Sequence, residues 1–282
     1  MALLRSLEAA LPSTQDVGPD VPVVELEDVR LTFKGVVAVD GLSYAVSPGE
    51  LFAIVGPNGA GKTSNFNLIS GVYRADRGAV RVLGQDVTSL SPHQIADLGV
   101  ARTFQNIELF ENLTVVDNLM LGRHQHMHYG TLSAMLRLPS VRRAEVDNRA
   151  VVEQIVDFLE IAQFRDSIVG MLPYGVQKRV ELGRALAMEP KVLLLDEPVA
   201  GMNLEETEDM ARFILDIRDE LGIAIILVEH DMGLVMDLAD RVLVLDFGRV
   251  IALDVPEVVQ NDPAVIGAYL GTGEDEIEEE SA

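Results

Sequence analysis

The chain contains no cysteine among its 282 residues, so it can form neither a disulfide framework nor a thiolate metal site. Long hydrophobic runs are also missing, because stretches such as residues 223 to 228 fall far short of the ~18 to 20 apolar residues that cross a bilayer. The first five residues are a poor match to a secretory signal. We therefore expect a cytoplasmic chain that reaches any membrane only through a partner.

Lysine is scarce, and the charge is strongly of one sign. Only four of the 22 basic residues are lysine, and the formal net charge is -23. Such a balance argues against binding a nucleic-acid backbone, so no nucleic-acid partner is predicted. Six acids between Glu274 and Glu280 indicate a solvated tail over residues 272 to 282. Residues 1 to 21 are predicted to be a loose N-terminal extension.

The full chain has 48% hydrophobic residues, enough for one large domain with a subdomain. Apolar and polar residues alternate over residues 23 to 33 and 42 to 46, which predicts half-buried strands. Fully apolar strands alternate with helical patterns, which predicts a mostly parallel α/β sheet. The expected strands are residues 50 to 55, 192 to 195, 223 to 228 and 242 to 245, and the expected helices are 64 to 69, 176 to 188 and 204 to 220. Residues 106 to 175 show only helical periods and are predicted to be a helical subdomain.

A glycine-rich loop follows the apolar strand that ends at Val55. Its sequence is Gly56-Pro57-Asn58-Gly59-Ala60-Gly61-Lys62-Thr63, followed by Ser64 at the expected helix start. The pattern G-x-x-x-x-G-K-T between a strand and a helix is typical of a loop whose N–H groups hold nucleotide phosphates. Lys62 is expected to reach the β- and γ-phosphates, and the Thr63 hydroxyl to bind Mg²⁺.

Two adjacent acids end a second apolar strand. Asp196 and Glu197 follow residues 192 to 195, and Pro198 then stops the strand. Open α/β sheets bind ligands at the carboxyl ends of their strands. We predict that Asp196 holds Mg²⁺ through its waters, and that Glu197 orients or deprotonates the attacking water. Two adjacent acids after a strand are often only part of a polar loop. The presence of the phosphate loop in the same chain favours a catalytic function for them.

Three further motifs occur along the chain in this order: Gln105, the segment Leu172 to Gln177, and His230. With them the sequence resembles the ABC transporter ATPase family over roughly residues 22 to 271. The resemblance implies an α/β fold: a P-loop NTPase (RecA-like) core with an N-terminal antiparallel β part and an inserted helical subdomain. It also implies that ATP and Mg²⁺ are the ligands, and that two subunits close on two nucleotides.

The resemblance assigns expected roles to single residues. Gln105 would contact the metal or the water and sense the membrane subunits, although it could be an ordinary polar strand-end residue. His230 would hydrogen-bond the γ-phosphate, although a histidine after a strand is often a turn residue. Phe33 matches the aromatic on which adenine stacks, its alternative being a core or strand-end phenylalanine.

The segment Leu172 to Gln177 departs from the family's usual Leu-Ser-Gly-Gly-Gln. Pro173 replaces the serine, Tyr174 the first glycine and Val176 the glutamine, so that Gln177 stands one place later. Proline offers neither a hydroxyl nor an N–H. Contacts with the γ-phosphate of the opposite subunit are therefore expected from Gly175, the following helix N-terminus and Gln177. Asn203 also stands where many relatives have aspartate.

Within the family, the sequence is most similar to the ATP-binding subunits of branched-chain amino acid importers. Supporting segments are residues 122 to 124, 182 to 187, 229 to 236 and 268 to 271. This resemblance implies integral membrane permease subunits, a second ATPase subunit that is identical or related, and indirectly a periplasmic or extracellular substrate-binding protein. It places the chain peripherally on the cytoplasmic face of the cell membrane.

Alternatives share this chemistry. An exporter motor, such as a lipopolysaccharide-transport ATPase, differs only in its partners. An ABC ATPase acting on ribosomes or DNA is disfavoured by the acidity, and intact Lys62, Asp196, Glu197 and His230 argue against a regulator that does not turn over. A metal site at His124, His126 and His128 is disfavoured because no carboxylate or cysteine lies beside them in the sequence.

Overall fold

The computed structural model describes residues 21 to 127 and 139 to 269. The expected N-terminal extension, apart from Val21, the acidic tail and His128 lie outside these residues. None of the helices in the described part of the chain combines the length and the apolar character that a bilayer crossing requires.

The strands form two sheets. A four-stranded antiparallel sheet has the order β2-β1-β4-β5. Its strands are β1 (Val24–Phe33), β2 (Val36–Val46), β4 (Arg77–Val82) and β5 (Gln85–Asp86). A six-stranded sheet has the order β10-β9-β3-β8-β7-β6 and is parallel except for β10. Its strands are β3 (Leu51–Val55), β6 (Val100–Arg102), β7 (Val192–Asp196), β8 (Ala224–Val228), β9 (Arg241–Asp246) and β10 (Arg249–Asp254). The expected parallel core and antiparallel β part are confirmed.

The central strands are buried on both faces. In β7, Leu193 and Leu195 pack into a core with the helices on one side, whereas Val192 and Leu194 pack into a core with the antiparallel sheet. This two-sided burial explains why β3, β7 and β8 appear in the sequence as continuous apolar runs.

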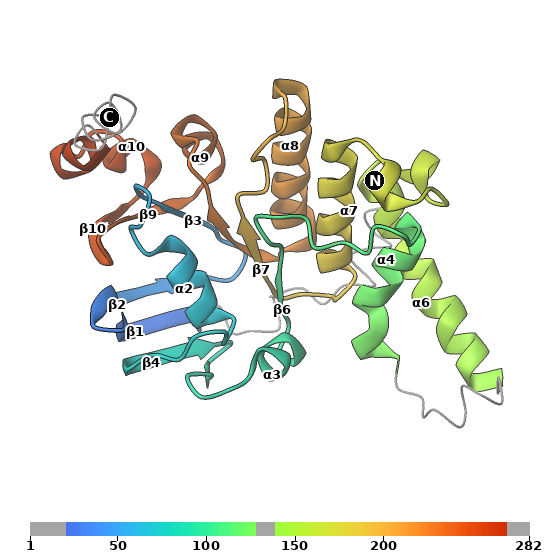
Figure 1. The fold of residues 1–282 in the computed structure, drawn as a ribbon, viewed down its shortest axis with the longest axis horizontal. Coiled ribbons are helices and arrows are strands. Elements are labelled where there is room, and N and C mark those ends of the chain that lie inside the picture. Colours follow the sequence, from blue (N-terminus) through green and yellow to red (C-terminus); the bar gives the residue numbers. More distant parts are fainter. Residues whose placement is uncertain (1–20, 128–138, 270–282) are drawn as a thin grey trace.

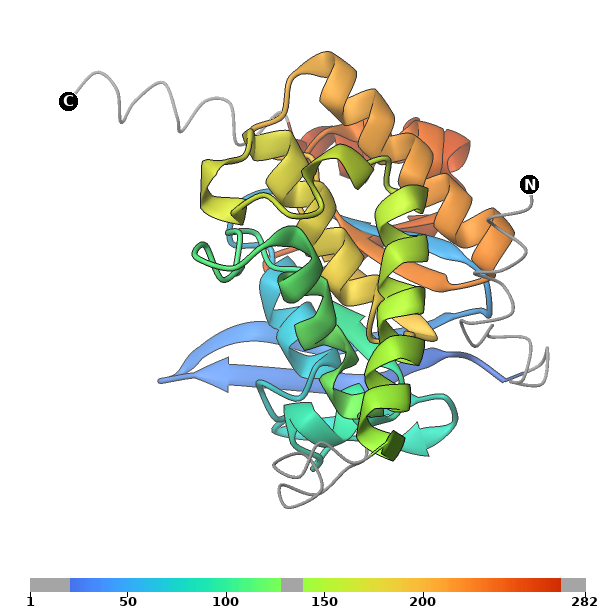
Figure 2. The ribbon, with the colours of Figure 1, turned by 90° about the vertical axis from the view of Figure 1, so that its right-hand side faces the viewer.

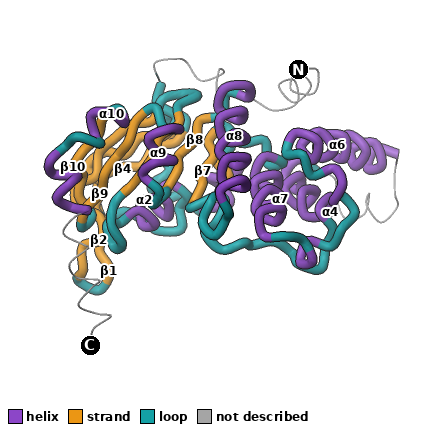
Figure 3. The backbone as a smooth tube through the Cα atoms, turned by 90° about the horizontal axis from the view of Figure 1, so that it is seen from above, coloured by secondary structure: helices purple, strands orange, loops and turns teal. Residues whose placement is uncertain are grey.

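Helices surround the six-stranded sheet. Helices α4, α6 and α7 gather at one end of the molecule, away from the antiparallel sheet, and α8 lies between them and the strands (Figures 1 to 3). The labelled helices are α2 (Lys62–Ile69), α3 (Pro92–Asp97), α4 (Val115–Gly122), α6 (Pro139–Phe158), α7 (Tyr174–Leu186), α8 (Leu204–Leu221), α9 (Met232–Leu238) and α10 (Pro256–Val259), with short 3-10 turns at Arg123–His126, Ala162–Phe164 and Val169–Met171. Residues 263 to 269 are also helical.

The secondary structure between β6 and β7 is helical, as the sequence predicts. Between residues 106 and 171 the described chain has helices and turns but no strand, only one isolated bridge from Thr114 to Ile168. α7 packs against α4 and α6, and it begins at Tyr174 rather than at the expected residue 176. Since α7 contributes Val180 and Leu182 to the core beneath the sheet, it joins the helical part to the strands.

Candidate nucleotide site

The glycine-rich loop connects β3 to α2 at the carboxyl end of the parallel strands. Gly56 has φ +150, and a Cβ atom there would come within 2.1 Å of the Leu245 carbonyl oxygen. Gly61, the N-cap of α2, has φ +101, and its Cβ would lie 2.7 Å from the Ala38 carbonyl oxygen. Only glycine fits these two positions, for two reasons. The loop backbone passes directly against other backbone atoms of the same chain, and its positive φ angles disfavour residues with a Cβ atom.

The Lys62 side chain folds back over its own loop. Its Nζ donates hydrogen bonds to the carbonyl oxygens of Gly56, at 2.5 Å, and Pro57, at 3.0 Å. Burial lowers the pKa of Lys62, and the negative charges of Glu197 and Asp196 oppose that shift. A buried cation therefore stands at the N-terminus of α2. The unpaired N–H groups and the positive potential of a helix N-terminus are a favourable setting for an anion.

Three side chains meet over this loop. Glu197 accepts a 2.9 Å hydrogen bond from Nε2 of Gln105 through Oε2, and its Oε1 lies 2.5 Å from Nε2 of His230. The three residues follow β6, β7 and β8, neighbouring parallel strands whose carboxyl ends share one edge of the sheet. Glu197 itself has φ +47, a strained conformation for a residue with a side chain. The fold holds this carboxylate in place against that strain.

A hollow of about 300 Å³ opens between the loop and these side chains. Most of the predicted site residues line it. They are Asn58, Gly59, Ala60, Gly61, Lys62, Thr63, Ser64, Gln105, Glu197 and His230, with Ala38 as an unexpected further member. A small polar hollow with one lysine and convergent backbone N–H groups suits the phosphate end of a nucleotide.

Asp196 lies behind the hollow and is buried. Its Oδ2 accepts a 2.8 Å hydrogen bond from Nη2 of Arg102, a residue that the sequence did not single out. The donors available for Mg²⁺ are the Thr63 hydroxyl, the Asp196 carboxylate and the Gln105 amide, and no group of three or more acids or histidines able to hold a metal occurs within the described chain. One carboxylate and one hydroxyl fit Mg²⁺, which keeps waters and substrate phosphate oxygens as its other ligands.

The remaining predicted residues do not line this hollow; among them, Gly56 and Pro57 stand at the start of the loop. Phe33 is 40% exposed at the end of β1, with its ring edge-on to Tyr73 and the ring centroids 4.9 Å apart. Tyr174, Gly175 and Gln177 stand at the start of α7 in the helical part and do not line the hollow. The loop and this segment are thus not brought together within one chain.

The start of α7 is shaped by its neighbours. Gly175 is buried, and a Cβ there would lie 2.4 Å from Oε1 of Glu206 in α8. Nε2 of Gln177 donates to the carbonyl oxygen of Leu172 at 2.8 Å. Asn203 caps α8, because its side chain accepts a hydrogen bond from the N–H of Glu206 at 3.0 Å. Asparagine serves as well as aspartate in that capping position.

The fold brings a carboxylate to one of the histidines. Glu189 lies beside His126, with Oε2 3.7 Å from Nδ1, so a carboxylate is present although the sequence neighbourhood contains none. Chain folding brings it from the loop that follows α7. The other Glu189 oxygen is 2.5 Å from Nη1 of buried Arg123, which gives this acid a structural partner.

The fold and the loop define the class: a P-loop nucleotide-binding protein with an inserted helical part. The ABC transporter family model matches residues 39–200, and the model for branched-chain amino acid ATP-binding cassette transporters matches residues 249–275. The chain belongs to the ABC transporter family and is a transport-coupled ATPase that binds ATP.

Curated relatives and solved structures agree with this membership. The chain is 37% identical over 250 residues to the high-affinity branched-chain amino acid transport ATP-binding protein BraF of Pseudomonas aeruginosa, covering 89% of this chain and 98% of the relative. It is 38% identical over 253 residues to LivG of Escherichia coli, with the same coverage. A crystal structure of the ADP conformation of an ATP-binding cassette from an ABC transporter superposes with a TM-score of 0.78 at 30% identity, covering 89% of this chain and 99% of that one.

Proposed function

We propose that this ATPase is the motor subunit of an importer for branched-chain or related amino acids. It would work peripherally at the cytoplasmic face of the membrane, with integral membrane permease subunits and a second, identical or related ATPase subunit. A periplasmic or extracellular substrate-binding protein would act indirectly, by delivering substrate to the permease. The match of residues 249–275 to the branched-chain amino acid transporter model and the names of the two relatives support this substrate class over an exporter's.

The observation that carries the motor function is the meeting of Gln105, Glu197 and His230 above the phosphate loop. In the proposed reaction, residues 56 to 64 hold the phosphates of ATP, Phe33 stacks on adenine, and Glu197 orients or deprotonates the attacking water. His230 would hydrogen-bond the γ-phosphate, and Gln105 would help to position the water.

Magnesium fits beside this group. Thr63 and Asp196, together with Gln105, would hold the ion, which when bound neutralises charge on the β- and γ-phosphate oxygens. Because Asp196 accepts a hydrogen bond from Arg102, the orientation of its carboxylate is already set before any ion binds.

The second ATPase subunit completes the site in this proposal. Tyr174, Gly175 and Gln177 of one chain would face the γ-phosphate held by the other. Their separation from the hollow within a single chain supports that arrangement. Closure of two chains on two nucleotides, and reopening after hydrolysis, would then supply the movement that drives transport.

A separate hollow offers a place for the permease. It has a volume of about 360 Å³ and a mainly apolar lining between the core and the helices, including Arg102, Phe104, Leu121 and Arg184. Leu121 is 42% exposed there. This apolar hollow adjoins β6, the strand that precedes Gln105. It is suited to receive a helix from a membrane subunit and to pass its movement to the catalytic group.

Purification of the tagged chain from its native membranes in mild detergent tests the proposal. Two multi-span membrane proteins and a second related ATPase are expected to accompany it. Leu121→Glu should lose the membrane proteins, whereas Val146→Glu, on a 60% exposed position of α6 outside this hollow, should retain them. Ribosomal or DNA-bound partners without membrane proteins would overturn the transport function and leave the ATPase chemistry standing.

A further inference from the structure

A buried ion pair on α7 lies next to the segment that carries Gln105. The side chains of Lys178 and Glu181 are each 2% exposed, and Nζ and Oε2 are 3.7 Å apart. Burying two charges at this separation costs more in desolvation than a loose contact returns, so the pair is weak evidence for stability. Both residues also make hydrogen bonds outside α7.

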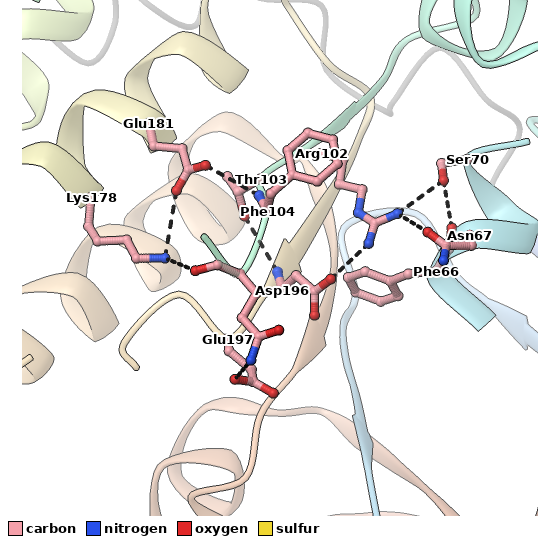
Figure 4. A network of polar contacts seen from close by, with 11 residues as sticks. Phe66, Asn67, Ser70, Arg102, Thr103, Phe104, Lys178, Glu181, Asp196 and Glu197 are labelled. Carbon is pink, nitrogen blue, oxygen red and sulfur yellow. Dashed lines mark hydrogen bonds and ion pairs between the residues drawn. The ribbon is translucent and has the colours of Figure 1, made fainter. Parts of the chain in front are cut away.

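Each member of the pair holds one end of the same dipeptide. Nζ of Lys178 donates a 3.0 Å hydrogen bond to the carbonyl oxygen of Gln105, and Oε1 of Glu181 accepts a 3.3 Å hydrogen bond from the N–H of Phe104. Figure 4 shows both contacts approaching from α7. The backbone on both sides of the Phe104–Gln105 peptide is thus fixed to one turn of a helix rather than to the sheet.

The same turn of α7 adjoins the segment predicted to serve the opposite subunit. The ammonium of Lys178 lies 5.9 Å from the centre of the Tyr174 ring, and Tyr174 is the first residue of α7. The side chain of Gln105 in turn donates a hydrogen bond through Nε2 to the Glu197 carboxylate. A short chain of contacts therefore runs from the start of α7, through Lys178 and the Gln105 backbone, to the predicted catalytic carboxylate.

We infer that Lys178 and Glu181 are positioning residues. They couple the position of α7 to the position of Gln105 relative to Glu197. The inference rests on the proposed function. When the start of α7 docks on the nucleotide of the partner subunit, the hydrogen bonds from Lys178 and Glu181 move the Phe104–Gln105 backbone with it. Gln105 then aligns Glu197 in the chain's own site. Each chain's hydrolysis thereby becomes sensitive to occupation of the other site.

The variant Lys178→Met with Glu181→Met removes both contacts and both charges with side chains of similar length, so no unpaired charge is left in the interior. We expect nucleotide affinity, measured with a fluorescent ATP analogue, to change less than about twofold, because the phosphate loop is untouched. The kcat for ATP should fall by roughly ten- to a hundredfold, because the catalytic group is misplaced rather than lost. Arg179→Met is the control: it changes the neighbouring residue of α7 and removes an ion pair with Asp209 of α8, and it should leave kcat near the wild-type value.

A double-mutant cycle with Gln105→Ala separates positioning from a general structural effect. In the Gln105→Ala background the double Met variant should cause no further loss of kcat, because the residue it positions is already absent. An equal loss in both backgrounds, or a loss with Arg179→Met as large as with the double variant, overturns the inference. Failure of the wild-type chain to hydrolyse ATP would overturn the proposed function instead.

Should the double variant fail to fold, Lys178→Met alone provides the same comparison. Burial raises the pKa of Glu181, so this acid can take up a proton when its partner is removed and avoid an isolated charge. The expected and contradicting outcomes of the cycle with Gln105→Ala are unchanged for this variant.

Discussion

Nη2 of Arg102 lies 2.8 Å from Oδ2 of Asp196, and the two side chains are only 10% and 8% exposed. The guanidinium also donates through Nη1 to Asn67 at 2.6 Å and to Ser70 at 3.3 Å. Figure 4 shows Arg102 lying between the strand that ends in Asp196 and the residues of α2 and its C-cap. The acid predicted to face Mg²⁺ is therefore fixed to the helix that follows the phosphate loop.

Removal of Arg102 should destabilise the fold through this acid. Arg102→Met leaves the Asp196 carboxylate buried without a partner, and breaking a buried pair costs on the order of 3–5 kcal/mol of unfolding free energy. Urea denaturation measures the loss. Combining Arg102→Met with Asp196→Asn should recover most of it, since the unpaired charge is gone. Two losses that simply add would show that the pair is not the cause.

The sequence predicted the strand, loop and helix of the phosphate site because their signals are local. The apolar run before Gly56 is buried on both faces in β3, and the acids Asp196 and Glu197 do end a buried strand. That Glu197 shares a site with Gln105 and His230 was expected from motif order alone. The hydrogen bonds that join them could not be predicted, because they depend on the register of three neighbouring strands.

Other strands and contacts of the structure have only weak signals in the sequence. β6 is only three residues long, too short for a periodic pattern. β4 begins with Arg77 and Gly78, residues that do not favour strands, and is held by pairing with β1. Lys178 and Glu181 have the spacing of an exposed helix pair, so their burial could not be inferred from spacing. Arg102 and Asp196 are 94 residues apart, and only the tertiary fold brings them together.

Loss of the Glu197 carboxylate should stop turnover without preventing ATP binding. Glu197→Gln keeps the size of the side chain but cannot accept a proton from water, so kcat should fall by roughly 10²- to 10⁴-fold. ATP-bound pairs should then accumulate, visible as a dimer in gel filtration with ATP. Glu205→Gln, an exposed acid in the first turn of α8, is the matched control. Normal turnover in Glu197→Gln would remove this residue from its proposed role.

The stability of the fold should depend on pH through Glu229. This carboxylate is buried and accepts hydrogen bonds from the N–H groups of Val199, at 3.2 Å, and His230, at 3.1 Å. Burial raises the pKa of Glu229 above the ordinary glutamate value, the charge of Glu197 adds to the rise, and the two hydrogen bonds oppose it. The folded chain therefore keeps this proton at pH values where the unfolded chain has lost it.

The sign follows from that difference in proton binding. The stabilisation from this carboxyl is complete below the ordinary glutamate pKa and is lost as pH rises through the raised value in the folded chain. Unfolding free energies from urea titrations, taken from about pH 4.5 upward, should fall with pH more steeply for the wild type than for Glu229→Gln, which does not titrate. Parallel curves for the two proteins would contradict the prediction.

Close packing between α4 and α7 depends on Gly122. A Cβ at this last residue of α4 would lie 2.4 Å from the carbonyl oxygen of Arg184 and 3.0 Å from Cβ of Ala187. Gly122→Ala should therefore force the helices apart and cost about 1–3 kcal/mol of unfolding free energy, despite alanine's higher helix propensity. Because neighbouring Leu121 lines the hollow proposed for the permease, the same variant should also weaken co-purification of membrane subunits.

A second glycine provides the control for that substitution. Gly267 lies in a helical stretch of the C-terminal part, and a Cβ there would meet nothing within 4 Å. Gly267→Ala should be neutral or should stabilise the fold by up to about 1 kcal/mol, the helix-propensity difference between the two residues. Urea denaturation of both variants separates close packing from propensity. If Gly122→Ala were as stable as Gly267→Ala, the contact between α4 and α7 would not need glycine, and the helices could accommodate a methyl group without moving.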